Sequence, residues 1–252
     1  MSPAFLGLSV NGPVKLAAVA VTFLGAGLAF AGWVSFAPHV APLPDMVAVS
    51  LESAGGSQIF AQVRETTIAE WNRCYEDGAC HLELHQPEGA DPQSFPATGI
   101  NWMDAQDYVH WLSKETRHPF RLPTSNEWFE MAKDVLPEVP DPIFTDPSLT
   151  WASAYQIEEN IDRSLRPVGF WSTTAEGVAD LDGNVWEWTG DCYNGETGTS
   201  PEAPCAAYVL GGEHRAVISF LVRDPARGGC AVGAPPAHLG LRLVSDRHPI
   251  KS

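Results

Sequence analysis

The residues best suited to chemistry in this chain lie in LDGNVWEW, residues 181–188. A glycine and an asparagine come shortly before two tryptophans, and these tryptophans bracket the carboxylate of Glu187. A carboxylate among rigid aromatic side chains can serve an enzyme, a metal-stabilised binding module or a scaffold, because its role depends on the groups that pair with it. The elements around this motif must therefore decide its chemistry.

A second candidate is HLELH, in which His81 and His85 stand four residues apart with Glu83 between them. On a helix this spacing places both rings on one face, where they could bind a metal ion. The stretch lies in a polar segment just before GADP, however, and such a segment is typical of a loop. We therefore expect His81 and His85 to lie on the solvated surface.

The five cysteines favour disulfide bonds over a metal site. In an oxidising compartment, Cys74 can pair with Cys80 across YEDGA, and Cys192 with Cys205 across a loop rich in glycine, proline and serine. Free thiols or other pairings are the alternatives. Neither pair has the spacing of a zinc site, since no second CxxC or paired histidines accompany it. Cys230 is left without an expected partner.

Three helices are predicted around these motifs. The first follows RETT, the second begins after Asn101 as its N-cap, and the third opens with Thr124 and Glu127 at the spacing of a capping box. The faces expected to be buried are Ile68, Trp71 and Tyr75 in the first helix, Ala105, Tyr108, Val109 and Leu112 in the second, and Trp128, Met131, Ala132 and Val135 in the third. Strands are predicted at 46–53 and 59–63.

The N-terminal part predicts a transmembrane helix. Residues 16–36 carry no charge, and at about 1.5 Å per residue they cover the roughly 30 Å hydrocarbon core of a bilayer. Lys15 precedes this segment and no Lys or Arg follows it before Arg64, so the positive-inside rule places residues 1–15 in the cytoplasm. The rest of the chain would then be periplasmic, anchored in the inner (cytoplasmic) membrane. A cleaved signal peptide, with a small-x-small site at Ala29-Phe30-Ala31, is the alternative.

Beyond the membrane segment we expect a proline-rich, extended spacer at 37–45 and one globular domain at 46–248. The composition argues against a nucleic-acid function. The chain carries 31 acidic and 15 basic residues, for a formal net charge of −16, and such a charge repels phosphate backbones and anionic lipid surfaces.

Five motifs follow one another in a characteristic order: GINWMDAQDYVHWLSKETRHPFRLPTSNEWFEMAK, RPVGFW, DLDGNVWEWTGDC, YVLGG and HLGLRLV. In this order, over residues 46–246, they resemble the formylglycine-generating enzyme and sulfatase-modifying factor family. The resemblance implies an α+β fold: the loop-rich variant of the C-type lectin-like architecture, with two helices and small twisted antiparallel sheets. The helices predicted above agree with this fold.

The resemblance also implies a calcium site in the DLDGNVWEW segment. Calcium takes about six to eight oxygens at about 2.3–2.6 Å, and a tight turn at Gly183 beside acidic side chains would supply carbonyls and carboxylates together. The expected ligands are Asp180, Leu181, Gly183, Val185 and Glu187. The alternative is a pure core motif, in which Glu187 is bound by backbone amides or by Arg242. A second calcium site of the family is weaker here, because residues 151–164 lack the asparagine expected near Ser153.

Copper is not expected, because the chain departs from the family at the reactive site. The oxidases of the family bind copper(I) through two cysteines just after the segment that matches YVLGG, and soft thiolates are what copper(I) requires. Here the segment reads LGGEHRAVISFLV, with Ala216 and Leu221 at the two cysteine positions. Cys230 lies nine residues beyond Leu221 and cannot restore a two-thiolate site alone.

Two residues in the same segment are weak candidates for acid–base catalysis. Glu213 takes the position of a serine in the family pattern, and His214 follows it directly. A carboxylate beside an imidazole can exchange protons near neutral pH. Structural or solvent-facing roles are the alternative for both.

Two classes of function follow. The first is a membrane-anchored, non-catalytic periplasmic module that binds or helps to assemble a protein partner. Bacterial relatives that accompany respiratory or denitrification enzymes point to a membrane redox complex as such a partner. The second is a divergent oxidase that matures a periplasmic protein or metabolite, as relatives in pyoverdine maturation do. The missing cysteine pair favours the first class.

Overall fold

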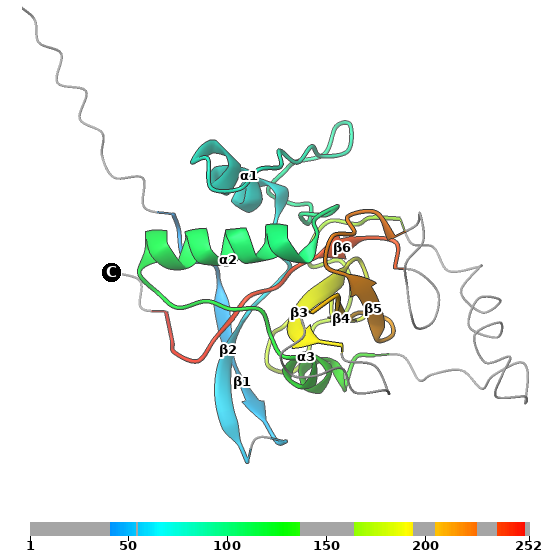
Figure 1. The fold of residues 1–252 in the computed structure, drawn as a ribbon. Coiled ribbons are helices and arrows are strands. Elements are labelled where there is room, and N and C mark those ends of the chain that lie inside the picture. The colour runs from blue at the N-terminus through cyan, green and yellow to red at the C-terminus, as the bar shows by residue number, and fades with distance from the viewer. Residues whose placement is uncertain (1–40, 54, 137–163, 194–204, 226–235, 250–252) are drawn as a thin grey trace, which may run out of the picture. The chain divides into compact units, whose positions relative to one another are not determined.

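The computed structural model describes residues 41–53, 55–136, 164–193, 205–225 and 236–249, all within one compact unit, Val40–Ser252. The described residues form an α+β domain (Figure 1). The helices are α1 (Ile68–Glu76), α2 (Trp102–Thr116) and α3 (Ser125–Ala132). The strands are β1 (Met46–Leu51), β2 (Ser57–Gln62), β3 (Trp186–Cys192), β4 (Ala207–Gly211), β5 (Ala216–Ser219), β6 (Leu239–Gly240) and β7 (Val244–Ser245).

The strands build two small sheets. The first has the order β1-β2-β7 and is antiparallel. The second has the order β5-β4-β3-β6, in which β3 pairs antiparallel with β4 and parallel with β6. The parallel pair sets Trp186 opposite Leu239, so the GNVWEW motif lies beside the C-terminal segment of the domain. This pairing is what brings Arg242 close to Glu187.

All three helices begin with a capping box. Thr67, Asn101 and Thr124 each accept a hydrogen bond from the backbone N–H three residues later, and the acidic side chain there binds back to the cap. These reciprocal bonds satisfy amides that have no partner within the helix. The predicted N-caps Asn101 and Thr124 are therefore confirmed.

The buried helix faces agree with the sequence prediction except at Val135 and Tyr75. Val135 lies beyond the end of α3 and is only partly buried, packed against the core. Trp71, Tyr108 and Trp128 are buried as expected, but Tyr75 in α1 is 38% exposed. Cys74 takes its place in the core, because its disulfide to Cys80 draws that side of the helix inward. The prediction for Tyr75 was wrong.

The tryptophans of the GNVWEW motif lie in the hydrophobic core. Trp186 is 2% and Trp188 is 0% exposed, and the indole N–H of Trp188 donates to the carbonyl of Ile100 at 2.9 Å. Gly211 and Gly212 let tryptophan rings approach the backbone closely. A Cβ at Gly211 would lie 2.0 Å from the ring of Trp128, and a Cβ at Gly212 would lie 2.5 Å from the ring of Trp186. The aromatic rings therefore stack on bare backbone.

The predicted transmembrane segment, 16–36, lies outside the described residues. Within the part of the chain that is described, no helix has both the length and the apolar character to cross a bilayer. The described end of the predicted spacer, 41–45, packs on the domain instead of standing away from it: Ala41 is 3% exposed and belongs to the core, and Leu43 lies against it. The domain therefore begins before residue 46.

Candidate functional site

The Asp180–Glu187 turn is shaped by two residues other than the expected glycine. Asp180 and Asn184 have left-handed backbone angles, with φ of 64° and 70°, a region that Asn and Asp tolerate better than most residues. Gly183 is needed for space instead, because a Cβ there would lie 2.7 Å from the ring of Trp171. The predicted turn is present, but its handedness comes from its acidic and amide residues.

Glu187 lies at the centre of a buried charge network. Its side chain is fully buried, as is that of Arg242, and the guanidinium Nη2 of Arg242 donates to Glu187 Oε1 at 2.8 Å. The indole N–H of Trp128 donates to Glu187 Oε2 at 2.6 Å. Successive strand residues face opposite sides, so Glu187 points away from Trp186 and Trp188. These contacts agree with the alternative to a calcium site, in which the motif belongs to the core and Arg242 binds Glu187.

Asp180 is also held by donors. It is 1% exposed, and its carboxylate accepts from the backbone amides of Gly169 and Trp171, the latter at 2.7 Å. These bonds tie the turn to the loop 164–173, which has no regular secondary structure in the described residues. Asp182, which is more exposed, accepts from the amide of Ser172 at 3.1 Å. The acidic side chains of the turn thus hold the neighbouring loop in place through its backbone amides.

Glu65 joins the network from the segment between β2 and α1, and the sequence carried no signal for it. It is 0% exposed, and Asn184 donates to its Oε1 at 3.0 Å. Burial raises the pKa of the Glu65 carboxyl well above its usual range; the nearby Asp180 carboxylate raises it further, while Arg242 opposes the rise. Glu65 Oε2 has no hydrogen-bond donor in the described part of the chain.

The residues as they lie do not fit a calcium ion. Both oxygens of Glu187 and both of Asp180 already accept hydrogen bonds, and the carbonyl of Gly183 accepts from the amide of Val185 at 3.0 Å. Among the described residues no group of three His, Cys, Asp or Glu side chains could hold a metal. Calcium binding stays a prediction.

The positions that the resemblance assigns to copper ligands hold no thiols. Ala216 begins β5 and is 0% exposed, while Leu221, just after the strand, is 59% exposed. The described cysteines are joined as Cys74–Cys80 and Cys192–Cys205, with Cα–Cα distances of 5.2 and 5.7 Å, as predicted. Cys230 lies outside the described residues. The described residues therefore do not fit copper(I).

The candidates for acid–base catalysis lie in the bend between β4 and β5. Glu213 and His214 are both half-buried, and the His214 ring packs edge-on against Trp186 with a centroid distance of 5.5 Å. The histidine is thus part of the aromatic packing above the GNVWEW motif. His81 and His85 are exposed and lie in irregular chain, so the helical spacing needed for a shared metal is not formed.

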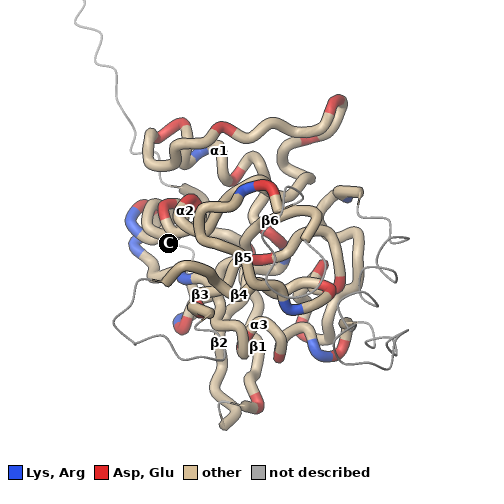
Figure 2. Tube along the Cα trace, turned by 45° about the vertical axis from the view of Figure 1, so that its right-hand side comes forward, with Lys and Arg blue, Asp and Glu red and all other residues tan. Residues whose placement is uncertain are grey.

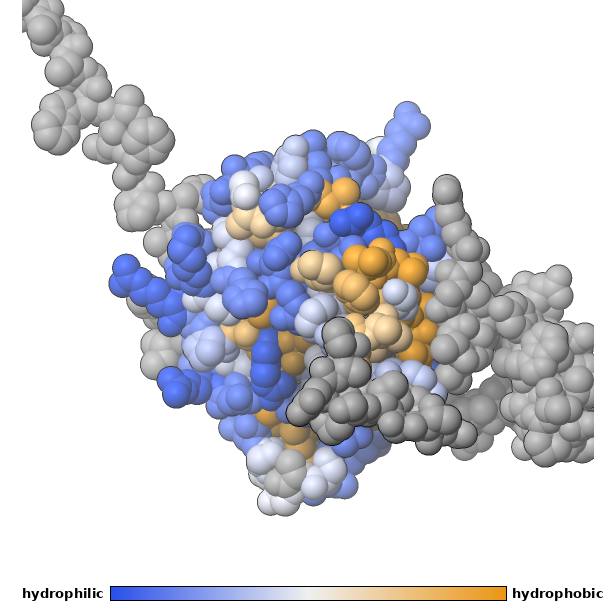
Figure 3. Space-filling model, in the orientation of Figure 1, coloured by the Kyte–Doolittle hydropathy of each residue, from blue (hydrophilic) through white to orange (hydrophobic). Residues whose placement is uncertain are grey.

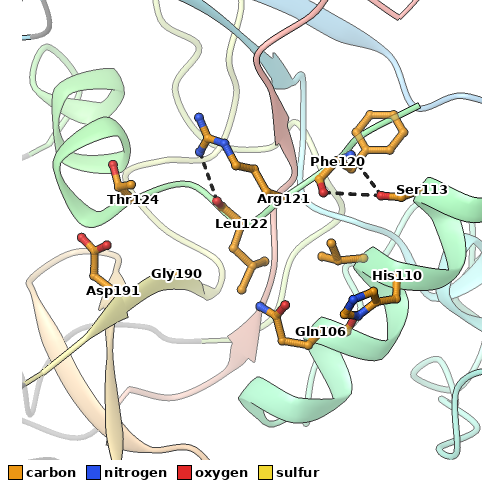
Figure 4. Close-up of a pocket in the computed structure, with 10 residues that line it drawn as sticks. Gln106, His110, Ser113, Phe120, Arg121, Leu122, Thr124, Gly190 and Asp191 are labelled. Atoms are coloured by element: carbon orange, nitrogen blue, oxygen red, sulfur yellow. Dashed lines mark hydrogen bonds between the residues drawn. The ribbon is translucent and has the colours of Figure 1, made fainter. Parts of the chain in front are cut away.

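A cavity of about 480 Å³ opens between α2, the segment 120–124 and β3 (Figure 4). It is lined by Gln106, Val109, His110, Ser113, Phe120, Arg121, Leu122, Thr124, Gly190 and Asp191. Its charged groups are engaged in structure: Arg121 pairs with Glu127 at 2.7 Å and with Asp246 at 2.6 Å, and Asp191 accepts from Ser125 at the start of α3. None of the predicted site residues lines it.

Charged residues are distributed differently from apolar ones on the surface. Acidic positions occur along the helices and loops in Figure 2, with fewer basic ones among them. Apolar residues gather over β5 and the N-terminal end of α2 in Figure 3. Here Met103 is 50% and Leu221 59% exposed, and the rings of Trp102 and Tyr208 stack at 3.9 Å. We call Trp102, Met103, Tyr208, Leu221 and Val222 the β5 apolar surface.

The β5 apolar surface is held together by the contact of α2 with the end of β5. The amide of Trp102 donates to the carbonyl of Phe220 at 3.2 Å, and Arg223 pairs with Asp104 at 2.7 Å. The capping carboxylate of α2 therefore also anchors the segment that carries Leu221. Sequence reasoning identified Leu221 only as a lost ligand and did not detect this surface.

The sequence profile of the family described as "Sulfatase-modifying factor enzyme 1-like domain" matches residues 45–247. Curated relatives named formylglycine-generating enzyme are 25% identical in Thermomonospora curvata, over 64% of this chain and 60% of the relative, and 25% identical in Mycobacterium tuberculosis, over 76% and 72%. A relative of the same name in Bos taurus is 25% identical over 72% and 50%. The chain thus spans between half and about three quarters of these relatives.

Solved structures agree on the fold. Treponema denticola variable protein 1 superposes with a TM-score of 0.50 at 18% identity, covering 82% of this chain and 94% of that one. PvdO from Pseudomonas aeruginosa gives 0.50 at 18%, covering 75% and 80%, and CarF gives 0.52 at 15%, covering 83% and 99%. At these identities the likeness concerns the fold alone.

Proposed function

Because this chain belongs to the sulfatase-modifying factor enzyme 1-like domain family, we propose that it is a non-catalytic member that binds a protein partner through the β5 apolar surface. The observation that carries the proposal is the replacement at the reactive position. Where the resemblance expects a thiolate, Leu221 is 59% exposed, and it directly follows Phe220, whose carbonyl accepts from the amide of Trp102. An exposed aliphatic side chain cannot bind copper(I), but it can be buried by a partner.

The position of this surface supports a binding role. It lies over the ends of α2 and β5, both fixed to the core, so little conformational entropy is lost when a partner covers it. Aromatic residues and methionine are enriched at the centres of protein interfaces, and Trp102, Tyr208 and Met103 supply both kinds. The acidic surface elsewhere would keep the free chain soluble and restrict which partners approach.

The apolar N-terminal segment 16–36 is the basis for a proposed location in the cell. In our proposal it anchors the chain in the inner membrane with the domain on the periplasmic side, where the two disulfides can form. The partner is then a protein at the same membrane, and a membrane redox complex is one that family analogy suggests. Protease treatment of spheroplasts should remove the domain and leave an anchored fragment. A mature chain that begins at Gly32 would contradict the anchor.

The test of partner binding compares two charge substitutions on exposed apolar residues. Leu221→Glu places a carboxylate in the β5 apolar surface, and Tyr75→Glu places one on α1, where Tyr75 is 38% exposed. We expect a partner that co-purifies with the full chain from mild detergent to be lost with Leu221→Glu and kept with Tyr75→Glu. A partner that survives both substitutions would contradict the proposed surface.

A separate measurement tests the absence of catalysis. The purified chain, supplied with copper(I), oxygen and a reductant, is incubated with a cysteine peptide of the sulfatase type, and the peptide mass is measured. We expect no change. Conversion of the cysteine to formylglycine would overturn the non-catalytic proposal, and its loss in a Cys230→Ser variant would identify the remaining thiol as the ligand.

A further inference from the structure

We propose that the guanidinium of Arg242 acts as a built-in cation for the Asp180–Glu187 turn, so that the turn is assembled without a divalent metal ion. The turn's sequence, with acidic residues around a glycine, predicts a site for a hard cation. The structure puts a different positive group among the same ligands. Arg242 is 0% exposed, so this group is isolated from solvent.

The donors of Arg242 are shared among the ligand types that calcium prefers. Nη2 donates to Glu187 Oε1 at 2.8 Å and to the carbonyl of Ala179 at 2.7 Å. Nη1 donates to the carbonyl of Gln62 at 2.9 Å, and Nε lies 3.1 Å from both oxygens of Glu187. One carboxylate and two main-chain carbonyls thus converge on one delocalised charge.

These three partners come from three separate parts of the fold. Gln62 ends β2 in the first sheet, Ala179 directly precedes the turn, and Glu187 belongs to β3 in the second sheet. Arg242 itself lies between β6 and β7, which pair with different sheets. The guanidinium therefore joins the two sheets to the turn, as a structural metal does in other proteins.

Few carboxyl oxygens of the network are without a hydrogen-bond donor. The carboxylate of Asp180 accepts from two backbone amides and that of Glu187 from Arg242 and Trp128. Of the three buried carboxyls in the network, only Glu65 Oε2 lacks a donor among the described residues. Calcium needs about six to eight oxygens, and a divalent ion next to Arg242 would also be repelled by its charge.

The first experiment uses the full chain in mild detergent, with calcium as the probe. We expect no heat of calcium binding by calorimetry, and less than about 1 °C difference in unfolding midpoint between excess chelator and about 1 mM calcium. A site with a Kd of about 10 μM would instead raise the midpoint by several degrees at that concentration. Stoichiometric calcium binding with such a rise would overturn the proposal.

The second experiment removes the built-in cation. In Arg242→Met the carboxylate and carbonyls lose their positive partner, so we expect a variant with a much lower midpoint that calcium now raises by several degrees. Arg121→Met is the control, since Arg121 also pairs with carboxylates, here Glu127 and Asp246, but is partly exposed. It should show no calcium response.

Each outcome of the Arg242→Met experiment either supports or overturns the proposal. A folded Arg242→Met variant that is indifferent to calcium would overturn the assignment of a cation's role to this residue. If the variant does not fold, calorimetry on the unaltered chain decides alone. A calcium response in Arg121→Met as large as in Arg242→Met would show a non-specific surface effect and would also overturn the proposal.

Discussion

The Asp180–Glu187 turn and the end of β5 both contain positions that the family resemblance assigns to metal ligands, but the two regions differ in burial and in hydrogen bonding. In the turn, Glu187 is 0% exposed and both of its oxygens accept hydrogen bonds from Arg242 and Trp128. At the end of β5, the position expected for a thiolate is Leu221, 59% exposed. The turn keeps its buried carboxylate with partners, whereas the position that the resemblance assigns to a copper ligand carries an exposed aliphatic side chain.

The difference follows from what each substitution costs. A buried charge that loses its partner keeps its desolvation penalty, so the members of the Glu187 network cannot change one at a time. An exposed ligand has no such constraint, because its neighbours do not depend on it for folding. A scaffold can therefore keep its buried network while an exposed position changes.

The largest expected effect is at the centre of the turn. Glu187→Gln keeps the shape of the side chain but leaves Arg242 as a buried charge without its partner, which costs about 3–5 kcal/mol of unfolding free energy. Leu221→Ala should change that free energy by less than about 0.5 kcal/mol, because Leu221 is exposed. Urea unfolding of the two variants measures the contrast, and similar losses in both would abolish the distinction between the two regions.

A smaller effect is expected where a tryptophan lies on bare backbone. In Gly211→Ala the new methyl group would lie 2.0 Å from the ring of Trp128, which itself donates to Glu187, so we expect a loss of about 1–3 kcal/mol. Gly190→Ala is the control, since its nearest atom is the carbonyl oxygen of Pro123 at 3.9 Å. Equal stability of the two variants in urea unfolding would show that Trp128 can move freely.

The two disulfides should stabilise the folded chain by similar free energies, with the larger contribution from the disulfide that closes the longer loop. The chain-entropy model predicts about 3 kcal/mol for Cys192–Cys205 and about 2 kcal/mol for Cys74–Cys80, since their sequence separations are 13 and 6. Replacing each pair by serine and comparing the midpoints of thermal unfolding checks the order. If the Cys74–Cys80 pair matters more, burial of Cys74 and not loop closure sets its contribution.

The smallest effect is expected at the half-buried cap of α3, outside both regions. Burial raises the pKa of Glu127, but hydrogen bonds from Arg121 and Thr124 outweigh it, so the pKa lies below its usual value. Stability from a lowered pKa is complete above the unfolded pKa and is lost as the pH falls through the folded one.

Glu127→Gln should therefore cost about 0.5–1.5 kcal/mol near neutral pH and less at about pH 3. The difference in unfolding midpoint between this variant and the unaltered chain, followed from about pH 6 to about pH 3, measures it. Glu83→Gln, which changes an exposed side chain, is the control. A difference that stays constant with pH would contradict the role of the Glu127 charge.

What the sequence determined by itself was local. Asn101 and Thr124 cap their helices because the bonds that stabilise a cap lie within three residues, and Cys74 pairs with Cys80 across one short turn. Tyr75 was placed in the core because helical spacing alone does not show which neighbouring residue a disulfide turns inward. Motif order identified the family, and with it the α+β fold.

Only the tertiary structure decided the roles of the charged residues. Arg242 reaches Glu187 because β3 and β6 run parallel, a pairing that joins segments about fifty residues apart and leaves no local pattern. Glu65 enters the same network from the first sheet's side of the chain, with Asn184 as its donor. A carboxylate in a sequence is only a potential ligand, and the groups that converge on it in space determine whether it binds a metal, an arginine or backbone amides.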